Sequence, residues 1–187
     1  SGAVCDDIGA AVGEPRGHRG GRSGARNISG AAAHCARQGG SLEEVKAVAD
    51  AVNRRTGTIS VRVDFEKGEI HYGGGFSGEP GLRCETHMDM RRMVREALDM
   101  VLADVRPQDG EKLYVLVNRM RYTAYTDGYI AAKAAHEHLA NLPVEQLRVA
   151  NFSNILDDYG FTFTVLCAGE AIWPHLAGQV ATDTFIL

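Results

Sequence analysis

The chain has 187 residues, of which 44% are hydrophobic and 24% are charged. These proportions are typical of one compact globular domain and exclude an intrinsically disordered or fibrous chain. The formal net charge of -4 excludes an overall positive field that would attract nucleic acid or an anionic membrane.

The sequence shows no membrane or targeting signal. No apolar run approaches the roughly 18 residues of a membrane-spanning helix. The first residues have neither the basic nor the apolar region of a signal peptide, so we expect a cytoplasmic protein that contacts no membrane. The four cysteines lie far apart and form no C-x-x-C pair, which predicts reduced thiols that are mostly buried.

The N-terminal segment is rich in glycine and arginine and has few side chains that could fill a core. We therefore predict a Gly/Arg-rich lead-in loop at residues 1–27 and a single domain at residues 28–187. The arginines could bind phosphate or RNA, but no aromatic side chains are interleaved on which bases could stack. A solvated loop is the favoured interpretation, and no nucleic-acid partner is expected.

Helical patterns follow the loop, and then the periodicity changes. An alanine-rich stretch at 31–37 predicts a short helix that ends at Gly39 and Gly40. Ser41 and Glu44 form a capping box for a second helix that ends near residue 56. Apolar residues then alternate with polar ones from Ile59 to residue 65, which predicts a strand with one buried face. A turn at 67–68 and a second strand at 69–72 complete a hairpin.

The rest of the chain alternates between helices and strands. Helices are predicted from residue 90 to near Pro107 and at 124–140, and strands at 113–118, 147–152 and 161–166. Strands interleaved with helices, including one hairpin, indicate an α/β domain with a mixed sheet.

A glycine-rich loop at residues 73–81 is the most unusual feature of the chain. Residues 73–78 fit the dinucleotide-binding pattern G-x-G-x-x-G, but Glu79, Pro80 and Gly81 follow instead of a helix. The loop is also no nucleophile elbow, because the position two after Ser77 is not glycine. A tight loop whose backbone lies close to a ligand or another strand is the better interpretation.

Metal-capable side chains gather at residues 84–89 but without a characteristic spacing. Cys84, Glu85, His87 and Asp89 all carry suitable atoms, and Asp89 could instead lie at the start of a helix. We therefore predict no metal site and no cofactor.

The glycine-rich loop carries a resemblance to a known family. The segment EIHYGGGFSGEPG at 69–81 resembles E-x-E-x-G-x-G-I-H-G-E-P-G of the dihydroxyacetone kinase K subunit. Further similar segments follow the family's order: ISGAAA at 28–33, GSLEEV at 40–45, YVLVN at 114–118, SNILDDYGFTFT at 153–164 and ATDT at 181–184. The chain is therefore identified as a relative of this family from residue 28 onward.

The resemblance implies the fold of the family's second, C-terminal domain. That fold is a two-layer α/β domain with a mixed sheet of about six strands and helices on one face. Family members form homodimers, so a homodimer is one expected assembly. A heteromer with a second chain that supplies the family's first domain is the other.

Several positions depart from the family pattern. Ser77 stands where the family has the histidine that captures dihydroxyacetone covalently, and a serine hydroxyl is a weaker nucleophile unless a base activates it. The family's first domain and its ATP-binding subunit find no counterpart here, so kinase activity of the chain alone is not expected. A Gly/Arg loop ending at Asn27 replaces an apolar helix of the family.

Two functions from different classes follow from the resemblance. The chain is a binding or regulatory subunit without kinase competence of its own, or it is a repurposed enzyme or enzyme subunit that acts on a small hydroxy-ketone without phosphoryl transfer. The candidate catalytic residues are Ser77, His71 and Glu79. The candidate substrate-binding residues are Gly75, Ser77, Gly78 and Asn118. Glu79 could instead cap local backbone amides, and Asn118 could satisfy the end of its strand.

Overall fold

A six-stranded mixed sheet forms the centre of the computed structural model, which describes residues 22–74, 81–86, 89–151, 159–176, 181–182 and 185–186. The strand order is β3-β2-β1-β6-β4-β5, and only the pair of β4 and β5 is parallel. The strands are β1 (Thr56–Asp64), β2 (Glu69–Tyr72), β3 (Arg83–Glu85), β4 (Lys112–Arg119), β5 (Val144–Ala150) and β6 (Gly160–Ala168). Two short strands, β7 (Ala181–Thr182) and β8 (Phe185–Ile186), pair separately. The predicted mixed sheet and the hairpin of β1 and β2 are confirmed.

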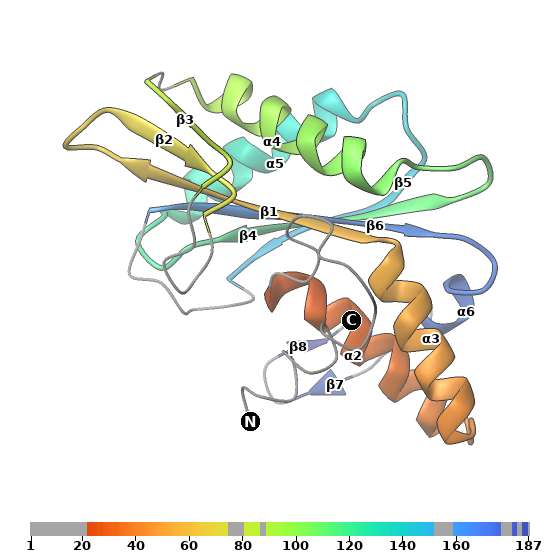
Figure 1. Cartoon of the computed structure of the whole chain (residues 1–187). Coiled ribbons are helices and arrows are strands. Elements are labelled where there is room, and N and C mark those ends of the chain that lie inside the picture. The colour runs from red at the N-terminus through yellow and green to blue at the C-terminus, as the bar shows by residue number, and fades with distance from the viewer. Residues whose placement is uncertain are drawn as a thin grey trace.

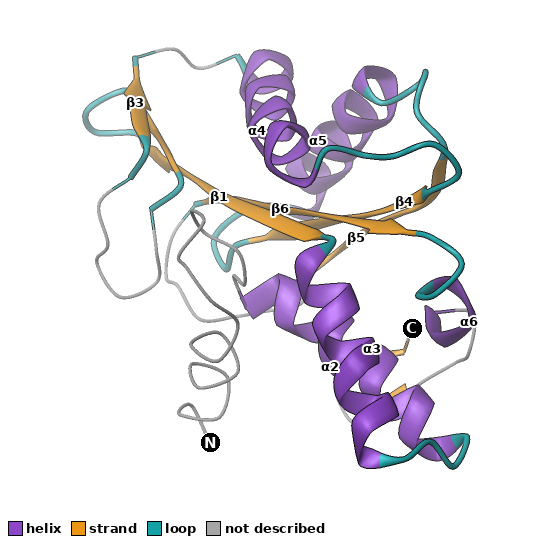
Figure 2. Ribbon diagram, turned by 45° about the vertical axis from the view of Figure 1, so that its right-hand side comes forward, coloured by secondary structure: helices purple, strands orange, loops and turns teal. Residues whose placement is uncertain are grey.

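Helices cover both faces of the sheet (Figures 1 and 2). One face carries α4 (Met90–Val105) and α5 (Tyr125–His138), and the other carries α2 (Arg22–Arg37) and α3 (Leu42–Arg54). A short helix, α6 (Trp173–Leu176), lies beside α2. The prediction that helices lie on one face is therefore wrong for this chain. None of the helices that the structure describes has the length and apolar character needed to cross a membrane.

The larger part of the core lies between the sheet and the helices α4 and α5. Alternate residues of β1, β4 and β6 point to this face, where they meet the apolar stripe of α4. Fully buried examples are Val61, Leu98, Val115 and Phe163. Burial of such side chains contributes about 1.5–3 kcal/mol each, so this layer holds the sheet in place.

A smaller apolar cluster and a polar strip share the opposite face, under α2 and α3. The cluster includes Ala31 and Val52 from the helices and Leu166 and Ala168 from β6. α2 begins at Arg22, so residues 22–27 are helical and do not belong to the predicted loop. The glycines of α2 lower its intrinsic helix propensity. Its contacts with α3, β1 and β6 supply the stabilisation that offsets this.

Side-chain caps start two of the helices as the sequence indicates. The Ser41 hydroxyl accepts a bond from the Glu44 amide, and the Glu44 carboxylate accepts one from the Ser41 amide at 2.7 Å. This capping box confirms the predicted start of α3. Asp89 is the N-cap of α4, where its carboxylate accepts the amide of Arg92 at 2.9 Å.

Three strands have their carboxyl ends on the same side of the sheet, and we call this side the carboxyl edge. β1 and β4 are both antiparallel to β6, and β5 is parallel to β4, so β1, β4 and β5 run in one direction. The chain leaves this edge at Asp64, Arg119 and Ala150. Crevices at the carboxyl ends of strands are where α/β sheets commonly hold ligands.

Candidate functional site

The structure describes only part of the predicted site. Gly75, Ser77, Gly78 and Glu79 belong to the segment 75–80, which lies outside the described residues. His71 on β2 and Asn118 on β4 are described, as are the residues on which the segment begins and ends.

The glycine-rich segment starts and ends against the sheet. The amide of Gly73 donates to the Ser60 carbonyl at 2.8 Å, and the Ser60 hydroxyl donates to the carbonyl of Gly74. Gly73 has a φ of +79°, a conformation that glycine adopts without strain. A Cβ on Gly81 would lie 3.8 Å from the Gly74 amide nitrogen, so the two ends of the segment are adjacent. Ser60 of β1 therefore fixes the point from which the loop departs.

A row of buried polar side chains continues from Ser60 across the sheet. Cross-strand pairing joins Ser60 to Thr162 of β6, and Thr162 to Asn118 of β4. We call these three residues the polar row. Asn118 is 1% exposed, Thr162 is 1% exposed and Ser60 is 8% exposed. Adjacent strands are about 4.8 Å apart, so Asn118 lies roughly 10 Å from the base of the loop. The structure thus places Asn118 and the start of the predicted loop on one face and in one row.

Several buried polar groups on this face have no hydrogen-bond partner within the described residues. They include the hydroxyls of Thr162 and Tyr114 and the side-chain amide nitrogen of Asn27. Asn27 is 4% exposed and lies on α2, the helix that contacts β1 and β6. A buried polar group without a partner costs about 1–3 kcal/mol, so such groups commonly serve a ligand. A hydroxyl and an amide are each able to hydrogen-bond to the oxygens of a small polar molecule.

By contrast, the neighbouring row is satisfied internally. The hydroxyls of Thr58 and Thr164 lie 3.0 Å apart and hydrogen-bond to each other. The unpartnered hydroxyl of Thr162 thus lies in the row that meets the glycine-rich segment.

An open hollow of about 670 Å³ adjoins this face at the edge where β1 ends. It is lined by residues of the hairpin and of two loops: Arg62, Val63, Asp64, Phe65, Glu66, His71, Tyr122 and Tyr159. Arg62 pairs with His71 across β1 and β2, one row away from Ser60. The lining combines one guanidinium, two carboxylates and an imidazole with aromatic rings, which suits a polar ligand.

Buried and partly buried hydrogen bonds hold the loops at this edge. The Thr123 hydroxyl donates to the carbonyl of Gly160 and accepts from its amide, both at 2.8 Å. The Tyr159 hydroxyl donates to the Asp127 carboxylate at 2.7 Å. Burial, followed by this bond and the Asp127 charge, raises the pKa of Tyr159 well above its ordinary value. Tyr159 is therefore neutral at physiological pH. It donates a hydrogen bond that orders this edge and does not act as an acid.

His71 lies apart from the polar row. Its side chain is about one-third exposed, and its Nε2 is 3.2 Å from a carboxylate oxygen of Glu69. His71 shares the hollow with Arg62, whereas Asn118 lies in the next row and three strands away from His71. The structure thus assigns His71 and Asn118 to neighbouring parts of one face.

The sequence did not predict Ser60, Thr162 and Asn27 as site residues. Its pattern indicates an exposed polar side for β1 and a loop at Asn27. The signal that could have found them is the alternation of phenylalanine with threonine in β6, where no charged residue occurs at 160–168. A strand without charges is typical of burial on both faces, and all nine residues of β6 are buried.

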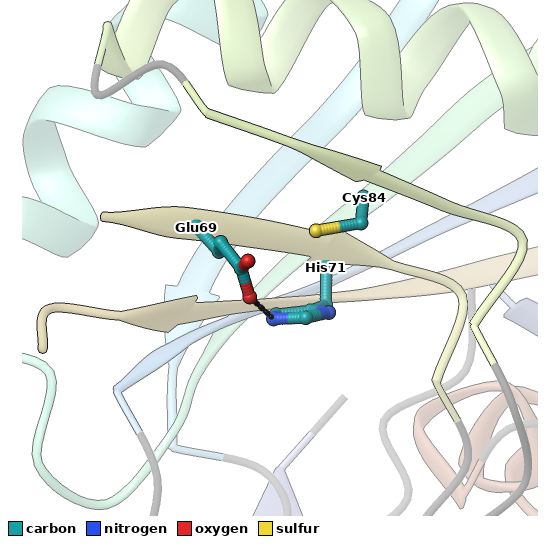
Figure 3. A group of neighbouring side chains, drawn as sticks. All are labelled: Glu69, His71 and Cys84. Carbon is teal, nitrogen blue, oxygen red and sulfur yellow. Dashed lines mark ion pairs between the residues drawn. The ribbon is translucent and has the colours of Figure 1, made fainter. Parts of the chain in front are cut away.

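The side chains of Glu69, His71 and Cys84 form the group in the described chain that could hold a metal ion (Figure 3). The set of Cys84, Glu85, His87 and Asp89 considered from the sequence does not assemble in the part that is described. Glu85 points to the other face of β3, because it pairs with Ile70. Asp89 caps α4, and His87 lies outside the described residues.

Comparison with known proteins gives one family match and several relatives. The family model described as the Dak1 domain matches residues 2–184. The dihydroxyacetone-binding subunit DhaK of a PTS-dependent dihydroxyacetone kinase from Listeria innocua is 32% identical, over 84% of this chain and 51% of that protein. A D-erythrulose kinase from Mycolicibacterium smegmatis is 26% identical, over 98% of this chain and 34% of that protein. The chain spans about half the length of the DhaK subunit.

Solved structures share the fold. The dihydroxyacetone kinase of C. freundii superposes with a TM-score of 0.79 at 20% identity, covering 87% of this chain and 32% of that one. The dihydroxyacetone kinase operon co-activator Dha-DhaQ superposes with a TM-score of 0.77 at 24% identity, covering 90% and 56%. The mixed α/β sheet described above is therefore the fold of these proteins.

Proposed function

This chain belongs to the Dak1 domain family, and on that premise we propose that it binds a small hydroxy-ketone such as dihydroxyacetone without covalent capture. We further propose that it acts as a binding or regulatory subunit and has no kinase activity of its own. The assembly is a homo-oligomer, or a hetero-oligomer with a chain that supplies the family's first domain.

Two unpartnered buried groups on α2 and on β6, Asn27 and Thr162, carry the binding proposal. Dihydroxyacetone has two hydroxyls that donate and accept hydrogen bonds and one carbonyl that accepts them. A ligand of this kind would satisfy both groups where water is largely excluded. The relative from Listeria innocua is named as a dihydroxyacetone-binding subunit, which supports this class of ligand.

Ser77 supports binding without a covalent bond. By the resemblance, this residue occupies the position of the capturing histidine. A neutral imidazole presents a free lone pair near pH 7, whereas a serine hydroxyl needs a base to attack a carbonyl carbon. Reversible hydrogen bonding is then the main contribution to affinity.

Titration calorimetry and mass spectrometry test the binding proposal together. Dihydroxyacetone added to the purified chain should release or absorb heat with saturation, and glycerol, which lacks the carbonyl, should bind more weakly. Denatured protein from the same mixture should keep its original mass, because no covalent bond forms. Absence of saturable binding, or a mass increase that survives denaturation, would contradict the proposal.

A turnover assay tests the missing kinase activity. The chain alone, incubated with dihydroxyacetone and Mg-ATP, should produce no phosphate ester detectable by phosphorus NMR. Formation of dihydroxyacetone phosphate would overturn the proposed role as a binding subunit. Consumption of the ketone without nucleotide would instead favour the alternative of a repurposed enzyme.

A further inference from the structure

We propose that Glu69, His71 and Cys84 form a Zn²⁺ site on the hairpin of β2 and β3, with the fourth coordination position open to water. This inference does not depend on the ketone-binding proposal. It stands on the register of the hairpin, on the distances between the donor atoms and on their chemistry.

The register of β2 and β3 places the three side chains on one face. Glu69 and His71 are two residues apart on β2, so they point the same way. His71 pairs directly with Cys84 on β3. Figure 3 shows the sulfur of Cys84 and the ring of His71 directed toward the carboxylate of Glu69. Three residues from two strands therefore converge without any rearrangement of the backbone.

The distances approach those of a zinc centre. The carboxylate of Glu69 is 3.2 Å from Nε2 of His71, and the candidate ligand atoms all lie within 4.8 Å of one another. Zinc–ligand bonds of about 2.0–2.3 Å in a tetrahedron separate the ligand atoms by roughly 3.3–3.8 Å. Side-chain rotations that move the ligand atoms by about 1 Å would bring the longest separation into this range.

The donor atoms select zinc among common cations. A thiolate, an imidazole and a carboxylate together suit Zn²⁺, whereas Mg²⁺ and Ca²⁺ prefer oxygen ligands alone. Three protein ligands with one open position is the arrangement of zinc sites that exchange a ligand. β3 is an edge strand and Cys84 is exposed, so water can reach the open position.

The opposite face of the hairpin holds the site in place. Ile70 and Tyr72 alternate with the proposed ligands and are 2% and 0% exposed. The amide of Leu82 donates to the carbonyl of Tyr72 at 2.7 Å, which ties β3 to β2. Ligands on a backbone anchored in this way lose little conformational freedom when a metal binds.

Charges of both signs surround the cluster. Asp64 pairs with Glu69 across the strands, and its carboxylate also binds Lys67 at 3.0 Å. Arg62 faces His71 from β1 and opposes a cation. Desolvation, followed by the charge of Glu69, raises the pKa of the Cys84 thiol. A divalent ion would reverse that effect, because it stabilises the thiolate.

Cobalt substitution provides the direct test. Purified chain treated with a chelator and kept reduced with a phosphine is titrated with Co²⁺ and followed by absorption. We expect one Co²⁺ per chain, a thiolate-to-cobalt charge-transfer band in the near ultraviolet and the visible bands of tetrahedral Co²⁺. Addition of Zn²⁺ should remove all of these bands because it displaces the cobalt.

Matched variants identify the ligands. Cys84→Ser should abolish the charge-transfer band, and Glu69→Gln and His71→Gln should weaken Zn²⁺ binding roughly tenfold or more. Glu85→Gln makes the same charge change on the other face of β3 and should leave the affinity unchanged, as should His138→Gln on α5. Circular dichroism confirms that each variant is folded.

Two results would overturn the zinc site. One is a charge-transfer band that persists in the Cys84→Ser variant, which would assign the thiolate to another cysteine. The other is an equal loss of affinity in Glu69→Gln and Glu85→Gln, which would indicate a general effect of charge and no coordination.

Discussion

At the scale of single residues, Gly160 has the strictest steric requirement in the described sheet. A Cβ at this position would overlap the carbonyl oxygen of Val61 on the neighbouring strand. We predict that Gly160→Ala lowers the free energy of unfolding by about 3 kcal/mol or more, because the clash is with backbone and cannot be relieved by rotation. Urea denaturation measures the change.

A matched glycine separates this clash from the general effect of adding a methyl group. Gly169→Ala introduces a Cβ whose nearest neighbour is the Glu111 side chain at 3.8 Å, an ordinary contact. It should change stability by less than about 1 kcal/mol. Equal losses in the two variants would refute the steric argument for Gly160.

Thr162 allows a second test at this scale, because its hydroxyl has no partner in the described structure. Thr162→Val keeps the shape of the side chain and removes the hydroxyl, so the free energy of unfolding should stay the same or rise by up to about 1 kcal/mol. Affinity for dihydroxyacetone should fall at the same time. Thr164→Val, by contrast, breaks the bond to Thr58 and should cost about 1–2 kcal/mol. A destabilised Thr162→Val with unchanged affinity would refute the binding role of the hydroxyl.

At the scale of elements, Arg55 joins the end of α3 to the end of α4. Its guanidinium donates to the Glu111 carboxylate through Nε at 2.8 Å and also through Nη2. It further donates to the carbonyls of Val105 at 2.9 Å and Arg106 at 3.3 Å, at the end of α4. Both side chains are mostly buried, with 22% of Arg55 and 11% of Glu111 exposed.

We predict that Arg55→Lys lowers the free energy of unfolding by about 1.5–3 kcal/mol. A lysine keeps the charge but cannot make the paired bond to the carboxylate and reach both carbonyls. Thermal denaturation gives the melting temperatures of Arg55→Lys and of Arg54→Lys, which is the control at an exposed arginine. A similar melting temperature for both variants would show that only the charge matters.

Glu96 links α4 to the hairpin through charge and gives stability a dependence on pH. Its carboxylate accepts bonds from Arg92 at 2.7 Å and from the Tyr72 hydroxyl at 3.0 Å, and it also pairs with Arg83. Burial alone would raise the pKa of Glu96, but these hydrogen bonds and charges outweigh burial and lower the pKa from 4.5 to about 2. A lowered pKa stabilises the fold above the unfolded value, and this stabilisation is lost as the pH falls toward 2.

The Glu96→Gln variant should therefore be less stable than the native chain by about 1–2 kcal/mol near neutral pH, allowing for solvent screening. The difference should shrink between pH 4.5 and about 2, as the native carboxylate takes up a proton. Urea denaturation at several pH values measures this. Glu137→Gln on α5, whose carboxylate is 3.9 Å from Lys133, is the exposed control. A difference that is independent of pH would contradict the assigned pKa.

At the scale of the whole molecule, the sequence predicted the order of elements better than their surroundings. Periodicity and caps identified the helices from Ser41 and from Asp89 and the hairpin after Thr56, because these signals are local. It did not predict that α2 begins at Arg22, nor that Ser60 and Thr162 are buried, because both depend on which helix covers which face. The convergence of His71 with Cys84 depends on the pairing of β3, a strand of three residues too short to leave a pattern.

The placement of the strands also predicts how stability is distributed over the molecule. β6 lies between β1 and β4, is buried along all nine residues and has helices on both sides. β3 is an edge strand of three residues with partly exposed side chains. Amides of β6 should therefore exchange with solvent on the order of a thousandfold more slowly than those of β3, because only global unfolding exposes the former. Hydrogen exchange followed by mass spectrometry or NMR measures the exchange rates of both strands. Equal protection of β3 and β6 would refute the prediction that the sheet opens first at β3.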